Sequence, residues 1–284
     1  MVSSKNINTR LSRNFHKTFV PERTHINAML KYASIGKKGS FVEIGQDTGI
    51  PTGKSSGKVV PTLDYCRGMG LIELSDESKN NSVKQPVLTD FGRVVLFEDP
   101  FLKENITQWI CHFNLCSPNI GADVWYQVFF KGFFTLGMSF NRKILLNYLE
   151  NIYEVQNTSI IGPLVRMYND PASFSACSAL VARGENYERK SAPVTDENIW
   201  GYGAWILNLI EIFYPDNNQI TLTELERAIG CKTIPGWDIS DFHKILFFFE
   251  QKKILNVDRH MEPWVIQPIE SSQNLWKKTY DDLI

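Results

Sequence analysis

Three short amphipathic segments, two of them closed by a glycine, constrain the fold of the first hundred residues most strongly. From about residue 21, apolar side chains recur at the spacing of one helix face: Ile26, Met29, Leu30 and Ala33. Ser40 is suited to cap a second helix that ends at Gly49. A third helix covers residues 59–69, and Gly70 terminates it. Because helices this short cannot bury a core alone, they must pack on one another.

Two short strands are predicted after the third helix. Residues 71–74 alternate in polarity, residues 86–88 form the partner strand, and the polar stretch 75–85 is the tip of a hairpin. Thr89 then caps a closing helix. Three helices, a hairpin and a further helix in this order predict a winged helix-turn-helix domain over residues 21–100. The fold class predicted for the whole chain is mainly α with small β-hairpins.

The positive charge of the chain is concentrated in its first quarter. Residues 1–70 hold eleven Lys and Arg against four Asp and Glu, a net charge of +7, whereas the whole chain carries −1. An anionic partner that contacts this quarter alone would explain the asymmetry, and a solvated surface with chance clustering is the alternative. Combined with the winged-helix pattern, the charge favours double-stranded DNA as the partner.

The start of the third helix is the predicted DNA contact, because helix N-termini carry free N–H groups and a positive dipole end. The residues expected to touch the DNA backbone are Lys54, Ser55, Ser56 and Lys58. Those expected to face the major groove are Thr62, Asp64, Tyr65 and Arg67, with Arg67 as the candidate for guanine. A loop and the wing would add flanking lysines: Lys37, Lys38, Lys79 and Lys84. A turn that merely tolerates tight backbone geometry is the alternative.

The rest of the chain divides into a helical part and a second copy of the opening pattern. Four further regions are expected: a flexible arm at 1–20, a helical domain at 101–195, a winged-helix-like domain at 196–270 and a C-terminal tail at 271–284. Within 196–270, Thr221 or Thr223 caps the second helix and Ser240 the third. The third helix is more apolar than residues 59–69, which favours packing or a homodimer over DNA reading.

No catalytic motif stands out in the sequence. HExxH, GxSxG and CxxC patterns are absent, so no catalytic or metal-binding residue is assigned. The polar run 185–190 mixes carboxylates and cations, as metal-dependent nucleases do, and a solvated linker explains it equally well. His16, beside Arg13 and Lys17, is either a base or phosphate ligand or, in the plainer interpretation, a structural hydrogen-bond partner.

Cysteine usage and hydropathy bear on the compartment. The five cysteines are too scattered for a secreted disulfide framework and fit reduced thiols: Cys66, Cys111, Cys116, Cys177 and Cys231. No apolar run reaches the roughly 18–20 residues that cross a bilayer. We therefore expect a cytoplasmic protein without a structural zinc.

Several segments resemble one bacterial family, most clearly over residues 15–130: FHKTFVPERTHINAMLKYA, TGIPTGKSSGKVVPTLDYCRGMGLI, LTDFGR, WICHFNL and DVWYQVFF. They look like the family encoded beside DNA phosphorothioation (Ssp/Dnd-type) defence genes, whose SspB-like members are DNA-nicking components. The resemblance implies DNA binding, strand nicking with Mg²⁺ or Mn²⁺ before sulfur insertion, and cysteine desulfurase and PAPS-reductase-like partners. It transfers no catalytic residue. A non-enzymatic transcriptional regulator and an adaptor are the alternatives.

Overall fold

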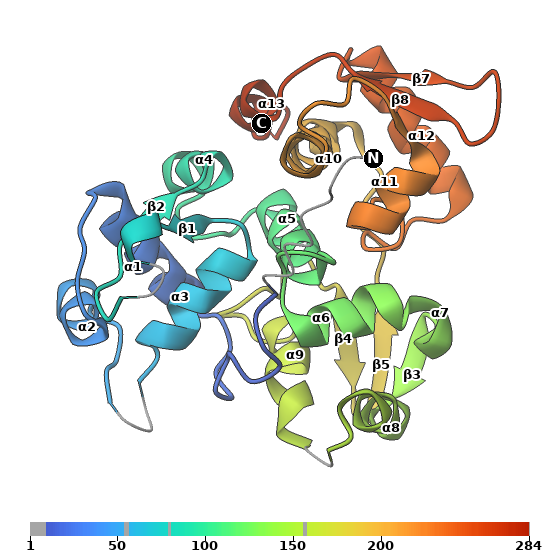
Figure 1. Cartoon of the computed structure of the whole chain (residues 1–284). Coiled ribbons are helices and arrows are strands. Elements are labelled where there is room, and N and C mark those ends of the chain that lie inside the picture. Colours follow the sequence, from blue (N-terminus) through green and yellow to red (C-terminus); the bar gives the residue numbers. More distant parts are fainter. Residues whose placement is uncertain (1–9, 54–56, 79–80, 156–157, 284) are drawn as a thin grey trace.

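Helices build most of the protein, and three small antiparallel sheets lie among them (Figure 1). The computed structural model describes residues 10–53, 57–78, 81–155 and 158–283. Helices of this length are stabilised mainly by packing their apolar faces. The prediction of a mainly α fold with small β-hairpins is confirmed.

The first unit, residues 23–98, has the element order that its sequence predicts. It comprises α1 (Arg23–Ser34), α2 (Phe41–Thr48), α3 (Val59–Gly68), β1 (Ile72–Leu74), a 3₁₀ turn (Asp76–Ser78), β2 (Pro86–Leu88) and α4 (Asp90–Glu98). β1 and β2 pair antiparallel, with Ile72 opposite Leu88. An isolated bridge joins Gly39, just before α2, to Lys84 at the foot of β2. The chain entering α2 therefore lies along the hairpin.

Local capping signals set the boundaries of these helices. The Ser40 hydroxyl accepts the Glu43 N–H, and the Glu43 carboxylate accepts the Ser40 N–H. Gly49 ends α2 in the left-handed conformation, at φ 71°. The Thr89 side chain accepts the Gly92 N–H at 2.9 Å. The predicted caps Ser40 and Thr89 are thus confirmed.

The second unit, residues 123–189, follows the buried helix α5 (Asn105–Cys116). Its helical elements are α6 (Asp123–Tyr126), a π-helical turn (Gln127–Lys131), α7 (Phe133–Leu136), α8 (Arg142–Tyr153), a 3₁₀ turn (Thr158–Ile160) and α9 (Ile161–Met167). Its strands are β3 (Ser139–Asn141), β4 (Leu180–Arg183) and β5 (Asn186–Arg189), in the sheet order β3-β5-β4.

This sheet corrects the expectation that residues 101–195 are helical and that the polar run 185–190 is a linker. Residues 186–189 form β5, whose inner face carries Tyr187 and Arg189. The strand pattern was hidden because one of its two buried side chains is an arginine. Strands of three or four residues also give too few alternations to be recognised.

The third unit, residues 199–268, follows a 3₁₀ turn (Asp196–Asn198). It comprises α10 (Ile199–Phe213), β6 (Ile220–Thr221), α11 (Leu222–Ile229), α12 (Ile239–Gln251), β7 (Leu255–Asp258) and β8 (Val265–Pro268). Thr221 caps α11 as predicted. The predicted cap Ser240 is wrong: α12 begins at Ile239 because the Asp238 carboxylate accepts the Asp241 N–H.

The three units share one order of elements. In the third unit the sheet order is β6-β8-β7, so the strand before the second helix pairs with the last strand, as in β3-β5-β4. In the first unit the Gly39–Lys84 bridge occupies the place of that pairing. The order of elements that the sequence predicts at the two ends of the chain therefore also occurs in its middle.

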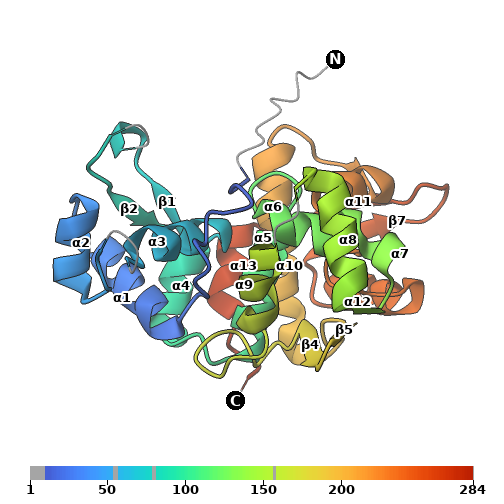
Figure 2. The same cartoon turned by 90° about the horizontal axis from the view of Figure 1, so that it is seen from below.

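The described residues near both ends of the chain pack into the fold. Leu11 bridges Ala122, and Phe15 and His16 are buried, so residues 10–20 are not a flexible arm, whereas residues 1–9 of the predicted arm lie outside the described residues. Figures 1 and 2 both show this dark blue segment between α3 and α9.

The C-terminal end forms a helix where a tail was expected. α13 (Ser272–Lys278) packs against α10 and α4, and the Trp276 ring lies 4.8 Å from that of Phe91. The buried apolar side chains of all three units form one continuous core. Within the described ranges, the structure has no helix that is both long and apolar enough to cross a bilayer.

Candidate nucleic-acid interface

The N-terminus of α3 is the first part of the predicted interface. The helix begins at Val59 with Lys58 at the N-cap, as the sequence predicts within one residue. The Lys58 ammonium pairs with the Glu22 carboxylate and lies 5.6 Å from the centre of the Phe19 ring. Its charge is therefore partly compensated within the protein. Lys54, Ser55 and Ser56 lie outside the described residues.

Most of α3 is buried, which changes the role that the helix can have. Seven of its ten residues are buried, among them Thr62 and Tyr65. The Phe15 ring covers Tyr65 edge-on at 4.7 Å, and the indole of Trp125 lies 6.0 Å from Tyr65. Thr62, which is 6% exposed, and Tyr65, which is 1% exposed, are therefore not available to face a groove. The sequence could not show this, because the covering side chains come from outside the first unit.

The half-exposed stripe of α3 carries a charge pair. Arg67 donates to the Asp64 carboxylate at 3.1 Å, and their side chains are 36% and 20% exposed. Burial raises the pKa of Asp64, and the neighbouring cations Arg67, Lys17 and Lys84 oppose that rise. A guanidinium already paired with a carboxylate reads a base only if that pair opens, whereas its remaining N–H groups can donate to a phosphate oxygen while the pair stays closed.

The predicted flanking lysines lie around the hairpin. Lys37 pairs with Asp47 at 2.9 Å, whereas Lys38 is exposed beside the Gly39–Lys84 bridge. The Lys84 ammonium donates to the Ser78 carbonyl at 3.0 Å and is close enough to Asp64 to influence its pKa. Lys79 is outside the described part of the chain.

Two cations that the sequence did not single out as DNA contacts complete this surface. Lys17 acts on the same Asp64 carboxylate as Lys84 and Arg67. Arg166, on α9, donates to the Thr18 carbonyl at 2.6 Å. We define the basic strip as Lys38 and Lys84 beside the hairpin, Arg67 on α3, Lys17 in the turn before α1, and Arg166 on α9. Arg166 could not have been found from sequence, since 148 positions separate it from Thr18.

His16 has the structural role that was the plainer interpretation. It is 2% exposed, and its Nδ1 accepts the Thr18 N–H at 3.0 Å. Burial lowers the pKa of His16 to about 4, and the nearby Arg166 acts in the same direction. The imidazole is therefore neutral at pH 7 and holds the turn that contains Lys17.

The described residues bring together no donor set for a divalent metal. They contain no group of three or more His, Cys, Asp or Glu side chains that could hold an ion. In the run 185–190, Glu188 pairs with Lys190 at 2.6 Å and Arg189 is buried. A Mg²⁺ site of the usual carboxylate type does not fit the residues in this part of the structure.

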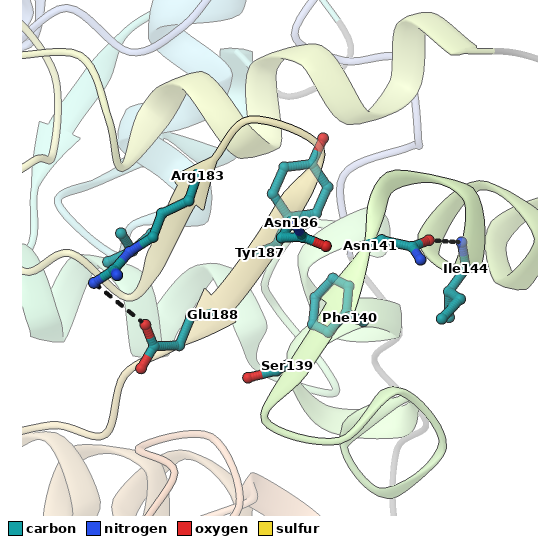
Figure 3. A pocket seen from close by; sticks show the side chains of 9 residues that line it. Ser139, Phe140, Asn141, Ile144, Arg183, Asn186, Tyr187 and Glu188 are labelled. Carbon is teal, nitrogen blue, oxygen red and sulfur yellow. Dashed lines mark hydrogen bonds and ion pairs between the residues drawn. The ribbon is translucent and has the colours of Figure 1, made fainter.

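A depression beside the second sheet does not supply a metal site either. It measures about 420 Å³ and lies on β3, β4 and β5 (Figure 3). The only carboxylate in its lining is Glu188, which also approaches Arg183 at 3.9 Å. A single, paired carboxylate does not make a two-carboxylate hydrolytic site.

One protein family matches part of the sequence, and two solved structures are similar to the fold of this chain. Residues 58–163 match a family described as "Protein of unknown function (DUF4007)". An SspB crystal structure is similar at a TM-score of 0.71 and 16% identity, over 98% of this chain and 90% of that chain. A magnesium-bound SspB structure is similar at a TM-score of 0.66 and 16% identity, over 99% and 91%. No curated protein matches the sequence. The chain therefore has an SspB-like fold.

Proposed function

We propose that this protein binds double-stranded DNA as the SspB-like component of a DNA phosphorothioation-type modification and defence system. The similarity to SspB over almost the whole of both chains carries the proposal. The basic strip supports it, because cations from two helices and the neighbouring connecting segments suit a polyanion. Cysteine desulfurase and PAPS-reductase-like sulfur-transfer proteins are the proposed partners.

Within this proposal, the first unit is a winged helix and the β1–β2 hairpin is its wing. The order of helices and strands, the cap at Ser40 and the Gly39–Lys84 bridge support this assignment. The burial of α3 argues against deep insertion into a major groove. We propose that the unit contacts phosphates through Arg67, Lys84 and Lys38, so its binding depends little on DNA sequence.

The direct test of DNA binding is fluorescence anisotropy on a labelled 30-base-pair duplex at low salt. Reversing two charges of the basic strip, Arg67→Glu with Lys84→Glu, should weaken binding at least tenfold. The matched control reverses two exposed lysines elsewhere, Lys143→Glu with Lys277→Glu, and should leave the affinity within about twofold. Equal affinities for the two double variants would refute the proposed surface.

Strand nicking, which the family resemblance implies, is a separate question. Since the described residues offer no Mg²⁺ site, we derive no cleavage step from them. A supercoiled-plasmid assay with Mg²⁺ or Mn²⁺, with and without the sulfur-transfer partners, decides it. Open-circle product would add nicking to the proposed function, and its absence would confine the function to DNA binding.

An adaptor role is the second candidate, and α12 is the observation that favours it. This helix corresponds to α3 in the order of elements, yet it exposes Ile239 at 67% and Phe247 at 55%. Exposed apolar side chains on a helix suit a protein partner better than DNA. Normal assembly with the sulfur-transfer partners in the absence of any DNA affinity would favour the adaptor.

A further inference from the structure

We propose that the turn at Lys17 and Thr18, together with Arg166 of α9, is a phosphate-binding site. The ligand of this site is a tetrahedral phosphate oxyanion, either as free phosphate or as part of a nucleic-acid strand. The assignment of that phosphate to a DNA strand rests on the proposed function. The site itself rests on backbone geometry, anchoring contacts and charge.

The backbone of the turn is held in an uncommon conformation. Lys17 and Thr18 both have positive φ, at 44° and 69°. Two consecutive residues with side chains in the left-handed region are unfavourable, and a β-branched threonine more so. Such strain persists only where the surroundings impose it, and it concentrates at binding sites.

One contact within the turn and two from distant parts of the fold impose this conformation. The His16 Nδ1 accepts the Thr18 N–H at 3.0 Å, the Arg166 guanidinium donates to the Thr18 carbonyl at 2.6 Å, and the Tyr65 hydroxyl donates to the Phe19 carbonyl at 3.1 Å. His16 and Tyr65 are buried, whereas Lys17 and Thr18 are exposed. The buried side chains thus hold an exposed turn in a fixed conformation, which lowers the entropic cost of binding a ligand there.

The charges at this turn lack the compensation found elsewhere in the first part of the chain. Lys37 and Lys58 each pair with a carboxylate. Among the described residues, no carboxylate lies within ion-pair distance of Lys17 or Arg166. The nearby Asp64 is engaged by Arg67.

The donors that remain match an oxyanion. Arg166 uses one terminal nitrogen for the Thr18 carbonyl, which leaves further N–H groups of its planar guanidinium for two oxygens of one phosphate. Lys17, exposed in the same turn, supplies a compact ammonium. Arg13 lies one turn of chain earlier, with its guanidinium 5.2 Å from the centre of the Tyr153 ring. It adds a further cation four residues before Lys17.

The test separates the phosphate site from the proposed function. Thermal unfolding is measured in sodium phosphate and in sodium chloride of equal ionic strength, for the wild type, Lys17→Gln and the exposed control Lys143→Gln. Phosphate should raise the Tm of the wild type and of the control by about 2 °C, and that of Lys17→Gln by less than half as much. An equal rise in all three proteins, or none in the wild type, would overturn the proposal. Arg166→Lys keeps the positive charge but loses the planar guanidinium with its paired N–H donors. This variant should lose most of the phosphate-dependent increase in Tm.

A second arm identifies the source of the phosphate. On the 30-base-pair duplex, Lys17→Gln should weaken binding three- to tenfold and lower the salt slope by about one. A phosphate-dependent Tm rise with unchanged duplex affinity would support a site for free phosphate and overturn its assignment to DNA. If neither the wild type nor any variant binds the duplex, while phosphate still raises the Tm of the wild type, the proposed function is refuted and the phosphate site is retained.

Discussion

Arg189 is a buried cation whose hydrogen bonds, among the described residues, all go to backbone carbonyls. Its guanidinium donates to the carbonyls of Phe133 at 3.0 Å and Gly137 at 2.7 Å, and also to that of Val128. Burial lowers the pKa of Arg189 to about 10, so it stays charged at pH 7. The Gly137 carbonyl lies at the C-terminal end of α7, where the helix dipole favours a cation, whereas the Phe133 carbonyl belongs to the first residue of α7 and the Val128 carbonyl lies in the π-helical turn.

Removing this guanidinium should therefore destabilise the second unit. We expect Arg189→Met to lower the free energy of unfolding by about 2–4 kcal/mol, since charged hydrogen bonds are lost and carbonyls are left unsatisfied. Arg183→Gln, at a side chain that is 77% exposed, should change it by less than about 0.5 kcal/mol. Urea denaturation of both variants provides the comparison, and equal losses would refute the role of Arg189.

The two buried histidines make stability depend on pH. Burial lowers the pKa of His16 to about 4 and that of His112 to about 3. Because the unfolded chain takes up protons near pH 6.5 and the folded protein does not, stability falls as the pH falls from 7 toward 4.

Each histidine should contribute about 2 kcal/mol to the loss of stability between pH 7 and pH 5. His112→Gln is expected to reduce that loss by this amount, although it also breaks the 2.7 Å bond to the Tyr168 hydroxyl at both pH values. His260→Gln, at a fully exposed position, is the control. If the pH dependence of His112→Gln equals that of the wild type, the neutral buried state of His112 is wrong.

At the scale of single elements, α4 depends on one glycine. A Cβ on Gly92 would come within 1.9 Å of the Leu71 carbonyl oxygen, so the helix could not keep its place against the backbone that leads into β1. Gly92→Ala should cost about 2 kcal/mol or more in the free energy of unfolding. Gly162→Ala on α9, where a Cβ would meet nothing within 4 Å, should be neutral or stabilising by up to about 1 kcal/mol. Chemical denaturation distinguishes the two, and a neutral Gly92→Ala would contradict this packing.

Elements with strong local signals were predictable, and those defined by distant contacts were not. Ser40, Gly49 and Thr89 set helix ends through neighbours three or four residues away, which a sequence shows directly. β5 escaped prediction because the burial of Arg189 depends on carbonyls more than fifty positions earlier.

In the candidate interface, too, the features set by local sequence signals were predictable and those set by distant contacts were not. The boundary of α3 and the lysines of the hairpin followed from sequence. The covering of α3 by Phe15 and Trp125 did not, nor did the approach of Arg166 to Thr18. These contacts join segments that no local pattern connects.

At the scale of the molecule, α13 joins the two ends of the chain. It packs against α10 of the third unit and α4 of the first, and Trp276 is 2% exposed at that junction. Trp276→Ala should lower the free energy of unfolding by about 3–5 kcal/mol. Phe97→Ala on the outer side of α4, where the ring is 83% exposed, should change it by less than about 0.5 kcal/mol. Equal stability of Trp276→Ala and the wild type would mean that the last helix is dispensable.

The central claim is that the basic strip binds the phosphate backbone of DNA. The most direct measurement is the dissociation constant for two 30-base-pair duplexes of unrelated sequence, each between 50 and 300 mM salt. The account predicts affinities within about threefold of each other and a log–log salt slope of roughly −4 to −5, one unit for each cation of the strip. Salt-independent binding, or a hundredfold preference for one sequence, would contradict it.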